Sequence, residues 1–370
     1  MKKLTLRDVA AELGVSAKTV ANAYSRPDQL SAELRERVLA TAARLGYPGP
    51  DPVAAGLRRG RVGAIGVAYA NRLSYAFDDP VARELLAGMT GVAESAGAGL
   101  LLLPGAPDVQ RRVAAVSAAV VDGLLVNSLA DDDPVLRAAI TRQLPLVVID
   151  QPRPARLRRL ARGIPWVGIE DRAAAAEAAE HLLDLGHRRF GVVSFGLWRS
   201  PSRGLVDVAA QRNATYAVSR DRLAGYRDAL ERHGLDWAAV PVFHGTDSTP
   251  AEGEAGGAAI LARNPRPTTV LCLSDRLAEG VLRAARHLGL RVPEDVSVVG
   301  FDDADPTAAA LDLTTVRQPH RGKGERAARA LLGLLSGSGR GTGSPPLRTE
   351  LITRGSTGPP QPKTRRADTD

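Results

Sequence analysis

The sequence predicts an α/β protein in which a small all-α module precedes a larger body built from two doubly wound parallel sheets. The first 48 residues contain three short segments whose apolar residues recur with the 3.6-residue period of a helix. From residue 61 onward, short apolar runs alternate with helical segments, and these runs form two successive series. The chain has 370 residues, of which 44% are apolar, and none of its apolar runs is long. This predicts two or three globular domains without a membrane span.

The N-terminal module begins with a helix that follows Thr5, whose capping box with Asp8 marks the start, and Gly14 ends it. Ser16 caps a second helix, and the turn SRPDQLS at residues 25–31 leads to a third. The tight turn at Gly14 predicts a helix-turn-helix relation between the first two helices. In such a motif the second helix enters the major groove of DNA.

The charge distribution agrees with a nucleic-acid partner for this module. Residues 1–61 hold eleven Lys/Arg against six Asp/Glu, in a chain whose net charge is +8. On the second helix, the face that we expect to meet DNA carries Ala17, Lys18, Ala21 and Asn22. A generic three-helix bundle with a well-solvated surface is the alternative.

The segment PGPDPVAAGLRRGR, residues 48–61, joins the module to the body. Asp51 can cap a helix, Pro52 suits its first position, and residues 53–57 can complete one or two turns. Gly56 weakens such a helix by roughly 1 kcal/mol, and the segment is too short to be stable alone. It should form only when something holds it, and a flexible linker is the alternative.

Nine apolar runs predict the strands of the body. The first series is VGAIGVAY, GLLLLP, GLLVN and PLVVID; the second is WVGIE, FGVVSFG, VPVFHG, TVLCLSD and VSVVGFDD. Ligands of such sheets bind beyond the carboxyl ends of the strands, so the natural site is the cleft between the two sheets. Several strands end there in polar residues: Asn127, Asp150, Ser274, Asp275 and Asp302. Because strands commonly end in turn residues, each position also has a purely structural explanation.

Several classes of function lack their sequence signals. No G-x-G-x-x-G follows the first strand, no G-x-S-x-G is present, and the six histidines have no metal-ligand spacing. The single cysteine, Cys272, has apolar neighbours, which predicts a buried thiol and no disulfide. We therefore expect no enzyme, cofactor or metal site. The N-terminus lacks the continuous apolar segment of a secretory signal, which predicts a cytoplasmic protein.

Residues 5–47 resemble the DNA-binding headpiece of the LacI/GalR (lactose-repressor) family of bacterial transcriptional regulators, and a looser likeness extends through nearly the whole chain. The resemblance implies a two-lobed, periplasmic-binding-protein-like body and a hinge helix that orders on operator DNA, where Leu57 wedges into the minor groove. Many family members carry a basic or imidazole side chain where this chain has Asn22, which instead favours adenine. The DNA-binding residues that we expect are Thr5, Leu6, Ser16, Ala17, Lys18, Thr19, Ala21, Asn22, Ser31 and Leu57.

The resemblance also implies an effector site in the cleft. SRDRLAGY, GFDD, LTTVRQP and CLSD are similar to effector-contacting segments of the family, while the other half of the cleft comes from the first series of strands and a loop after its first strand. The expected effector-binding residues are Tyr75, Phe77, Asn127, Asp150, Arg220, Arg222, Ser274, Asp302 and Gln318. A long loop at 196–219 and an Arg-rich loop at 152–163 depart from the family near the mouth of the cleft, so the effector's identity stays open.

These observations predict a headpiece at 1–48, a hinge at 49–60, an effector-binding and dimerisation domain at 61–357 and a disordered tail at 358–370. The N-lobe of the body takes about 61–168 and 319–346, and the C-lobe about 169–318 and 347–357. We expect a sequence-specific repressor that binds double-stranded operator DNA as a homodimer or larger assembly, under control of a carbohydrate. A purine-type or other metabolite, or a solute-binding protein without a regulatory role, is the alternative.

Overall fold

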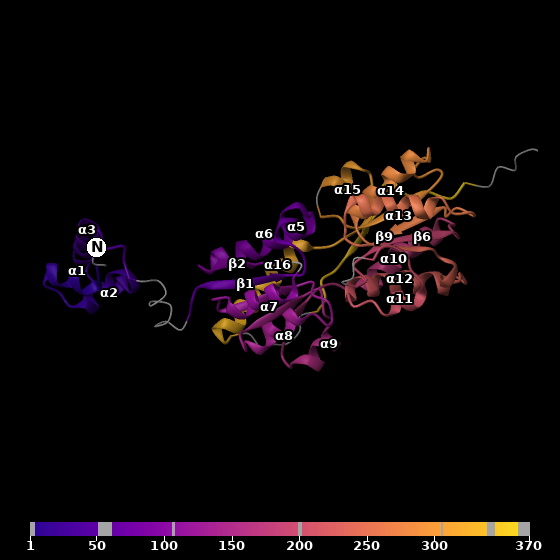
Figure 1. Cartoon of the computed structure of the whole chain (residues 1–370). Helices are drawn as coiled ribbons and strands as arrows, with labels where there is room; N and C mark the ends of the chain where they lie inside the picture. Colours follow the sequence, from indigo (N-terminus) through magenta and orange to yellow (C-terminus); the bar gives the residue numbers. More distant parts are fainter. Residues whose placement is uncertain are drawn as a thin grey trace, which may run out of the picture. The chain divides into compact units, whose positions relative to one another are not determined.

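The computed structural model describes residues 4–50, 61–105, 108–198, 202–304, 306–338 and 345–361, and it divides into two compact units, Met1–Gly63 and Ala64–Asp370 (Figure 1). The predicted hinge helix, with Leu57, lies outside the described residues. The two units are the small helical module and the α/β body that the sequence predicts.

The N-terminal unit contains the three predicted helices and one short 3₁₀ turn. These elements are α1 (Leu6–Leu13), α2 (Ala17–Ser25), η1 (Pro27–Gln29) and α3 (Ala32–Leu45). The predicted capping box is present, since the Thr5 N–H donates to Asp8 Oδ2 at 2.7 Å, and Gly14 ends α1 with φ 66°. Val9, Val20 and Val38, one from each helix, are fully buried and form the centre of this core.

The first lobe of the body is a parallel five-stranded sheet of order β2-β1-β3-β4-β5. Its strands are β1 (Ala64–Tyr69), β2 (Gly99–Leu103), β3 (Gly123–Asn127), β4 (Leu146–Ile149) and β5 (Trp166–Val167). The sequence WVGIE, which opens the second series of apolar runs, therefore completes the first sheet through β4. One face is covered by α7 (Val109–Ala118), α8 (Pro134–Thr141) and α9 (Pro154–Leu160).

The other face of this sheet is covered by α6 (Pro80–Ser95) and by α16 (His320–Ser336), which returns from the far end of the chain. The two helices approach closely. A Cβ on Gly88 of α6 would lie 2.1 Å from the carbonyl oxygen of Arg321, and one on Gly324 of α16 would lie 2.1 Å from that of Leu85. The glycines thus fix the position of α16, and with it the residues of its first turns.

The second lobe is a mixed seven-stranded sheet of order β12-β11-β10-β9-β6-β8-β7. Its strands are β6 (Phe190–Phe195), β7 (Gly204–Leu205), β8 (Val242–Gly245), β9 (Thr269–Cys272), β10 (Ser297–Asp302), β11 (Thr314–Arg317) and β12 (Glu350–Ile352). The five central strands are parallel. Four of them, β6, β8, β9 and β10, lie in predicted runs, whereas β11 lies outside those runs, and both edge strands, β7 and β12, are antiparallel. Strand β7 lies within the long loop at 196–219, and Cys272 is fully buried in β9.

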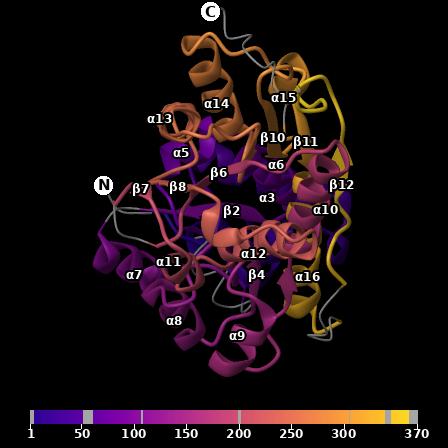
Figure 2. The same ribbon diagram turned by 90° about the vertical axis from the view of Figure 1, so that its right-hand side faces the viewer.

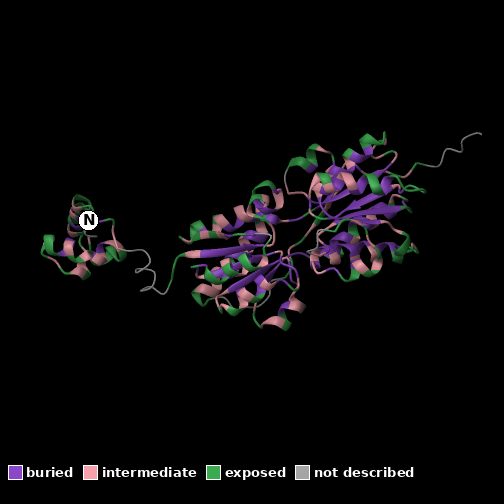
Figure 3. Cartoon of the chain, viewed as in Figure 1, coloured by how far each residue is buried: buried purple, intermediate pink, exposed green. Residues whose placement is uncertain are grey.

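Helices cover both faces of this sheet (Figure 1). They are α10 (Asp171–Asp184), α12 (Ala217–Arg232), α13 (Pro250–Leu261) and α14 (Asp275–His287), with the short elements α5 (Leu73–Asp78), α11 (Val208–Arg212), η2 (Trp237–Ala239) and α15 (Pro306–Ala310) elsewhere in the body. The central strands of both lobes are among the most buried elements (Figure 3), whereas β2, β7 and β12 are partly exposed, so each lobe has its core on the two faces of its sheet.

The C-terminal segment with β12 runs along one edge of the body (Figure 2) and is fixed by His187. One ring nitrogen, Nε2, lies 2.9 Å from the carbonyl oxygen of Gly358, and Nδ1 lies 2.9 Å from Thr268 Oγ1. A neutral ring donates to the first and accepts from the second. Gly358 belongs to the predicted tail, but its N–H also donates to Ser297 Oγ, whereas residues 362–370 are outside the description.

We predict that His187 makes the body less stable in mild acid. Burial lowers the pKa of His187 below its usual value, so below about pH 6.5 the unfolded chain binds more protons than the folded one. Stability contributed by the neutral ring should therefore fall as pH falls, by up to about 1.4 kcal/mol per pH unit. In urea unfolding at pH 7.5, 6.5 and 5.5, the stability difference between wild type and His187→Gln should shrink with acidification. A constant difference would contradict this assignment.

Candidate functional site

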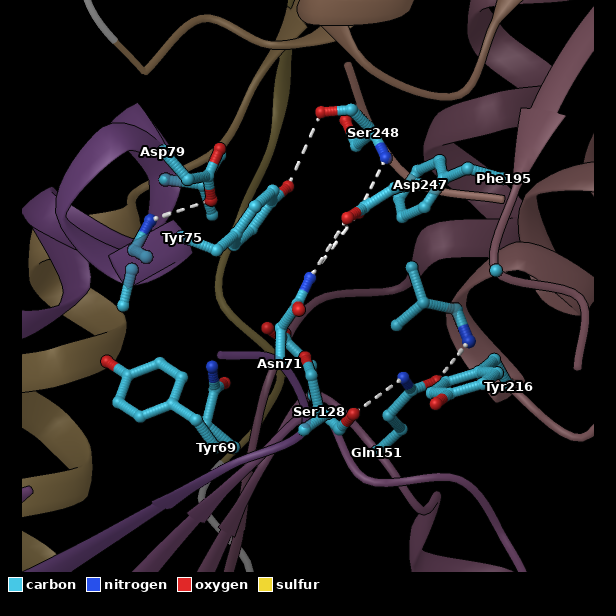
Figure 4. A pocket seen from close by; sticks show the side chains of 18 of the residues that line it. Tyr69, Asn71, Tyr75, Asp79, Ser128, Gln151, Phe195, Tyr216, Asp247 and Ser248 are labelled. Atoms are coloured by element: carbon cyan, nitrogen blue, oxygen red, sulfur yellow. Dashed lines mark hydrogen bonds between the residues drawn. The ribbon is translucent and has the colours of Figure 1, made fainter. Parts of the chain in front are cut away.

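A cavity of about 640 Å³ lies where the carboxyl ends of the strands of both lobes face each other (Figure 4). In the first lobe, it is lined by residues that end or follow β1, β3 and β4. In the second lobe, the lining residues end or follow β6, β8, β10 and β11. This is the position at which doubly wound sheets bind ligands, and the sequence predicts it.

Six of the nine residues predicted for this site line the cavity: Tyr75, Asn127, Asp150, Arg222, Asp302 and Gln318. They come from both lobes and from the crossover between them. The cleft therefore combines polar groups that are far apart in the sequence.

Phe77 and Arg220 do not line the cavity, for the same geometric reason. Tyr75 and Phe77 lie two residues apart on α5, a helix where the sequence predicts a loop, and such neighbours point about 200° apart. Phe77 is 59% exposed as a result. Arg220 is likewise two residues from Arg222 on α12, and it pairs with Asp131 of the first lobe at 3.0 Å.

Ser274 also does not line the cavity. Its hydroxyl accepts the Leu277 N–H as the N-cap of α14 and lies 2.7 Å from Ser248 Oγ. Ser248 itself lines the cavity, so Ser274, which the sequence predicts as an effector-binding residue, instead supports a residue of the cavity lining. The segment CLSD does lie at the carboxyl end of a strand, β9, but the Ser274 side chain caps α14 and does not face the cavity.

Arg222 is the most heavily constrained cation of the cleft. It is 5% exposed, its Nε donates to Asp171 Oδ1 at 2.8 Å, and its guanidinium lies 3.7 Å from the centre of the Phe301 ring. Its Nη1 lies 3.8 Å from Asp302 Oδ1. Burial raises the pKa of Asp302 well above its usual value, and Arg222 opposes this shift.

Lys323, on α16, is a buried cleft residue that the sequence analysis missed. Its Nζ donates to Asp150 Oδ1 at 2.7 Å and to Gln318 Oε1 at 2.8 Å. Gln318 Nε2 in turn donates to Asp302 Oδ1 at 2.7 Å. A continuous hydrogen-bonded chain thus connects a carboxylate of the first lobe with one of the second. No local motif marks Lys323, because its partner Asp150 is 173 residues away in sequence.

The two lobes touch across the cleft in this structure (Figure 4). Asn71 Nδ2 lies 3.2 Å from Asp247 Oδ2, and the Tyr75 hydroxyl donates to the Ser248 carbonyl oxygen at 3.4 Å. Arg276 lies 3.8 Å from Asp79 Oδ1, and burial raises the pKa of Asp79 to about 6. These contacts join the two lobes across the cavity.

The cavity also contains polar atoms that lack a partner within the described part of the chain. These include the Tyr69 hydroxyl and Asn127 Oδ1, which are buried on neighbouring positions of β1 and β3. Aromatic rings of Phe195, Trp198 and Tyr216 line the opposite side. A ligand with hydroxyl groups on its rim and an apolar face satisfies both sets of groups.

In the N-terminal unit, Lys18 is exposed on α2, while Ala17, Thr19, Ala21 and Asn22 are half-buried on or beside the same face. Three of the expected DNA-binding residues are helix N-caps: Thr5, Ser16 and Ser31. Leu6 packs against the small core. Asn22 Nδ2 donates to Gln29 Oε1 at 3.3 Å, a contact that the sequence did not indicate.

The described residues contain neither a metal-binding cluster nor a membrane-spanning helix. No group of three or more His, Cys, Asp and Glu side chains there is arranged to hold a metal ion. None of the helices described is both long and apolar enough to cross a membrane.

Comparisons with known proteins match both units. Residues 5–49 match the bacterial regulatory proteins of the lacI family, and residues 179–357 match the periplasmic binding protein-like domain. An HTH-type transcriptional regulator of Mycobacterium tuberculosis is 42% identical over 370 residues, covering 97% of this chain and 98% of that protein. The HTH-type transcriptional regulator IpsA of Corynebacterium glutamicum is 42% identical over 336 residues, covering 90% and 91%.

Solved structures give the same result. A LacI-family regulator from Corynebacterium glutamicum matches with a TM-score of 0.70 and 36% identity over 97% of this chain and 99% of that chain. The structure of the lac repressor dimer bound to operator and the anti-inducer ONPF matches with a TM-score of 0.76 and 27% sequence identity. The match covers 96% of this chain and 100% of that chain. The CelR–cellobiose complex matches with a TM-score of 0.68 and 27% sequence identity, over 95% of this chain and 99% of that chain. Since these likenesses span both units, this chain is a DNA-binding transcriptional regulator and belongs to the LacI family.

Proposed function

We propose that this regulator is a repressor that binds a pseudo-palindromic operator as a homodimer, and that a neutral polyhydroxylated small molecule in the cleft controls its operator affinity. In this proposal residues 1–48 read the operator, residues 49–60 form the hinge with Leu57 as the minor-groove wedge, and residues 61–357 bind the effector and dimerise. A two-fold dimer doubles the small contact that one headpiece makes, which is why a palindrome is expected.

The observation that carries the choice of effector is the pairing of the buried charges. The three buried cations of the cavity lining are each paired with a carboxylate: Lys323 with Asp150, Arg222 with Asp171, and Arg112 with Asp133. Their charges are therefore already neutralised when a phosphate or carboxylate group approaches. Burial of an anion next to cations that are already paired costs desolvation energy without a new partner. Hydroxyl groups, which donate and accept, suit the carboxylates and the unpartnered Asn127 Oδ1.

Similar proteins support a carbohydrate as the class of ligand. The structure of CelR, 27% identical to this chain, is a complex with cellobiose. The aromatic side chains that line the cavity, among them Trp198 and Tyr216, could stack on the apolar face of a sugar ring. A purine would use the same rings, and the ligand screen described below separates the two classes.

The contacts across the cleft supply a mechanism for control. Asn71 and Asp247, and Tyr75 and Ser248, join the two lobes only while they are close together. A ligand that binds one lobe arrangement more tightly than another shifts their populations in proportion to that difference. A change in lobe arrangement alters the spacing of the two hinge segments of a dimer, and a marginal hinge helix should form or melt in response.

Thermal shift measurements on the full chain test the effector class. A panel should contain neutral sugars and polyols, sugar phosphates, sugar acids and purine nucleosides, because a ligand of the folded state raises the unfolding temperature by mass action. We expect stabilisation from a neutral polyhydroxylated compound, followed by a change in operator binding. Stabilisation by phosphates or purines alone would refute the proposed effector class. If the full chain bound no DNA duplex at all, the proposed role as a repressor would be refuted as well.

For the operator, we predict that Asn22→Ala removes the base preference at one position in each half-site. Asparagine makes bidentate contact with adenine N6 and N7, and such a contact discriminates against other bases by about 1–3 kcal/mol. Selection from a randomised duplex library, followed by sequencing, measures the preference. If the enriched site is unchanged in Asn22→Ala, this residue does not read the operator.

A further inference from the structure

The side chain of Gln29 lies beside the face of α2 that carries Asn22, although Gln29 belongs to the following turn. Asn22 Nδ2 donates to Gln29 Oε1 at 3.3 Å. Gln29 is exposed, and Asn22 is half-buried. This contact leaves the side-chain oxygen of Asn22, Oδ1, and one of the two Nδ2 hydrogens available to a partner outside the protein.

The backbone holds Gln29 in this position through a run of short-range bonds. The Arg26 N–H donates to the Asn22 carbonyl oxygen at 2.9 Å, and the Gln29 N–H donates to the Arg26 carbonyl oxygen at 3.0 Å. Pro27, with its fixed φ, starts the 3₁₀ turn, and Ser31 begins α3 directly afterwards. Gln29 is therefore anchored between two helices, and its side chain meets α2 from a defined direction.

The orientation of the Asn22 amide determines which base it can read. To contact adenine, the amide must accept from N6–H with Oδ1 and donate to N7 with Nδ2. A free asparagine side chain samples two amide orientations and up to three χ1 rotamers, and only one combination suits the base. A neighbour that accepts from the second Nδ2 hydrogen selects that orientation before DNA binds.

We propose that Gln29 is a positioning residue for operator reading: its Oε1 fixes the Asn22 amide in the orientation that recognises adenine. This inference rests on the proposed function, in which Asn22 reads the operator. It assigns to Gln29 an effect on base preference. This effect is separate from the effect that the charge or size of the side chain at position 29 has on affinity for any duplex.

Two substitutions with opposite charge separate preference from affinity. In Gln29→Glu the carboxylate can only accept, so the Asn22 orientation and the adenine preference should be kept, while the added negative charge weakens binding to every duplex. In Gln29→Lys the ammonium can only donate, so it should hold Asn22 Oδ1 away from the base. Adenine preference should then fall about ten-fold, the worth of one charged hydrogen bond, while general affinity rises.

The experiment is selection of the full-length chain and its variants on a randomised duplex library at one salt concentration, with affinity for a non-specific duplex measured alongside. Asn22→Ala identifies the position read by residue 22. A third variant, Gln29→Met, removes the acceptor without adding charge and should lower the preference about two- to six-fold, the number of orientations released. Asp28→Asn, one residue away in the same exposed turn, is the matched control and should leave the preference unchanged.

The outcomes distinguish this inference from the proposed function. If Asn22→Ala loses the preference at one position but Gln29→Lys and Gln29→Met keep it, Gln29 has no positioning role, although the proposed function stands. If base preference changes only in parallel with affinity for the non-specific duplex from Gln29→Glu through wild type to Gln29→Lys, residue 29 acts only by its charge. The inference is then also overturned. If the wild-type chain enriches no site, the proposed function itself fails and the inference fails with it.

Discussion

Replacing Asp302 by Ala should lower the affinity of the cleft for its effector roughly 100-fold and so abolish the response of operator binding. Asp302 ends β10, is 9% exposed, and accepts from Gln318 Nε2 at 2.7 Å. Its removal deprives a ligand hydroxyl of its partner and leaves both Gln318 and Arg222 with one polar contact fewer. The contacts to Gln318 and Arg222 are lost in the free and the bound protein alike, so the expected factor comes from the hydrogen bond between the ligand hydroxyl and the carboxylate. A hydrogen bond to a charged group is worth about 1.5–3 kcal/mol, and 100-fold corresponds to about 2.7 kcal/mol.

Operator affinity of the ligand-free variant should stay within a few-fold of wild type, because Asp302 belongs to the body and not to the headpiece. The measurement is an operator titration with and without the compound found in the thermal shift panel. Asp303→Ala is the matched control. Asp303 pairs with Arg317 at 2.8 Å and Arg354 at 2.9 Å, outside the cavity lining, so its loss should lower stability but preserve the response. A normal response from Asp302→Ala would refute the proposed effector site.

The elements that sequence alone predicts well are those determined by neighbours in the chain. The capping box at Thr5 and the left-handed Gly14 depend on residues within one helical turn, and both are present. The buried parallel strands follow from short apolar runs bounded by turn residues. Strand β7 was missed because two residues, Gly204 and Leu205, carry no recognisable period and pair only because β8 is already in place.

For the cleft, sequence predicts strand ends better than side-chain directions. Asp150 directly follows β4 and Asp302 ends β10, and their backbone position alone brings them to the cavity. The sequence predicts a loop at Tyr75 and Phe77, whereas the helical geometry of α5 directs only Tyr75 into the cleft. The resemblance assigns the segment that contains α16 to the N-lobe, but it does not indicate Lys323, because the pairing with Asp150 depends on how α16 packs against α6.

Because the ion pair between Lys323 and Asp150 is buried, Lys323→Met should lower the free energy of unfolding of the body by about 3–5 kcal/mol. The side chains of Lys323 and Asp150 are only 3% and 14% exposed, so removal of the ammonium leaves a buried carboxylate without its main counter-charge. Exposed pairs are worth far less. Arg329 and Glu325 lie on the same helix 3.0 Å apart but are 65% and 36% exposed, and Arg329→Met should cost under about 1 kcal/mol.

A double-mutant cycle distinguishes loss of the ion pair from loss of packing. Asp150→Asn in the Lys323→Met background removes the orphaned charge, so urea unfolding should show that most of the lost stability returns, whereas each single variant is strongly destabilised. Additive losses would mean that the lysine acts by packing alone. Because Gln318 joins Lys323 to Asp302, the rescued double variant should still respond to its effector less well than wild type. Recovery of stability without recovery of the response would show that the hydrogen-bonded chain from Asp150 to Asp302 orients the carboxylates of the proposed effector site as well as joining the two lobes.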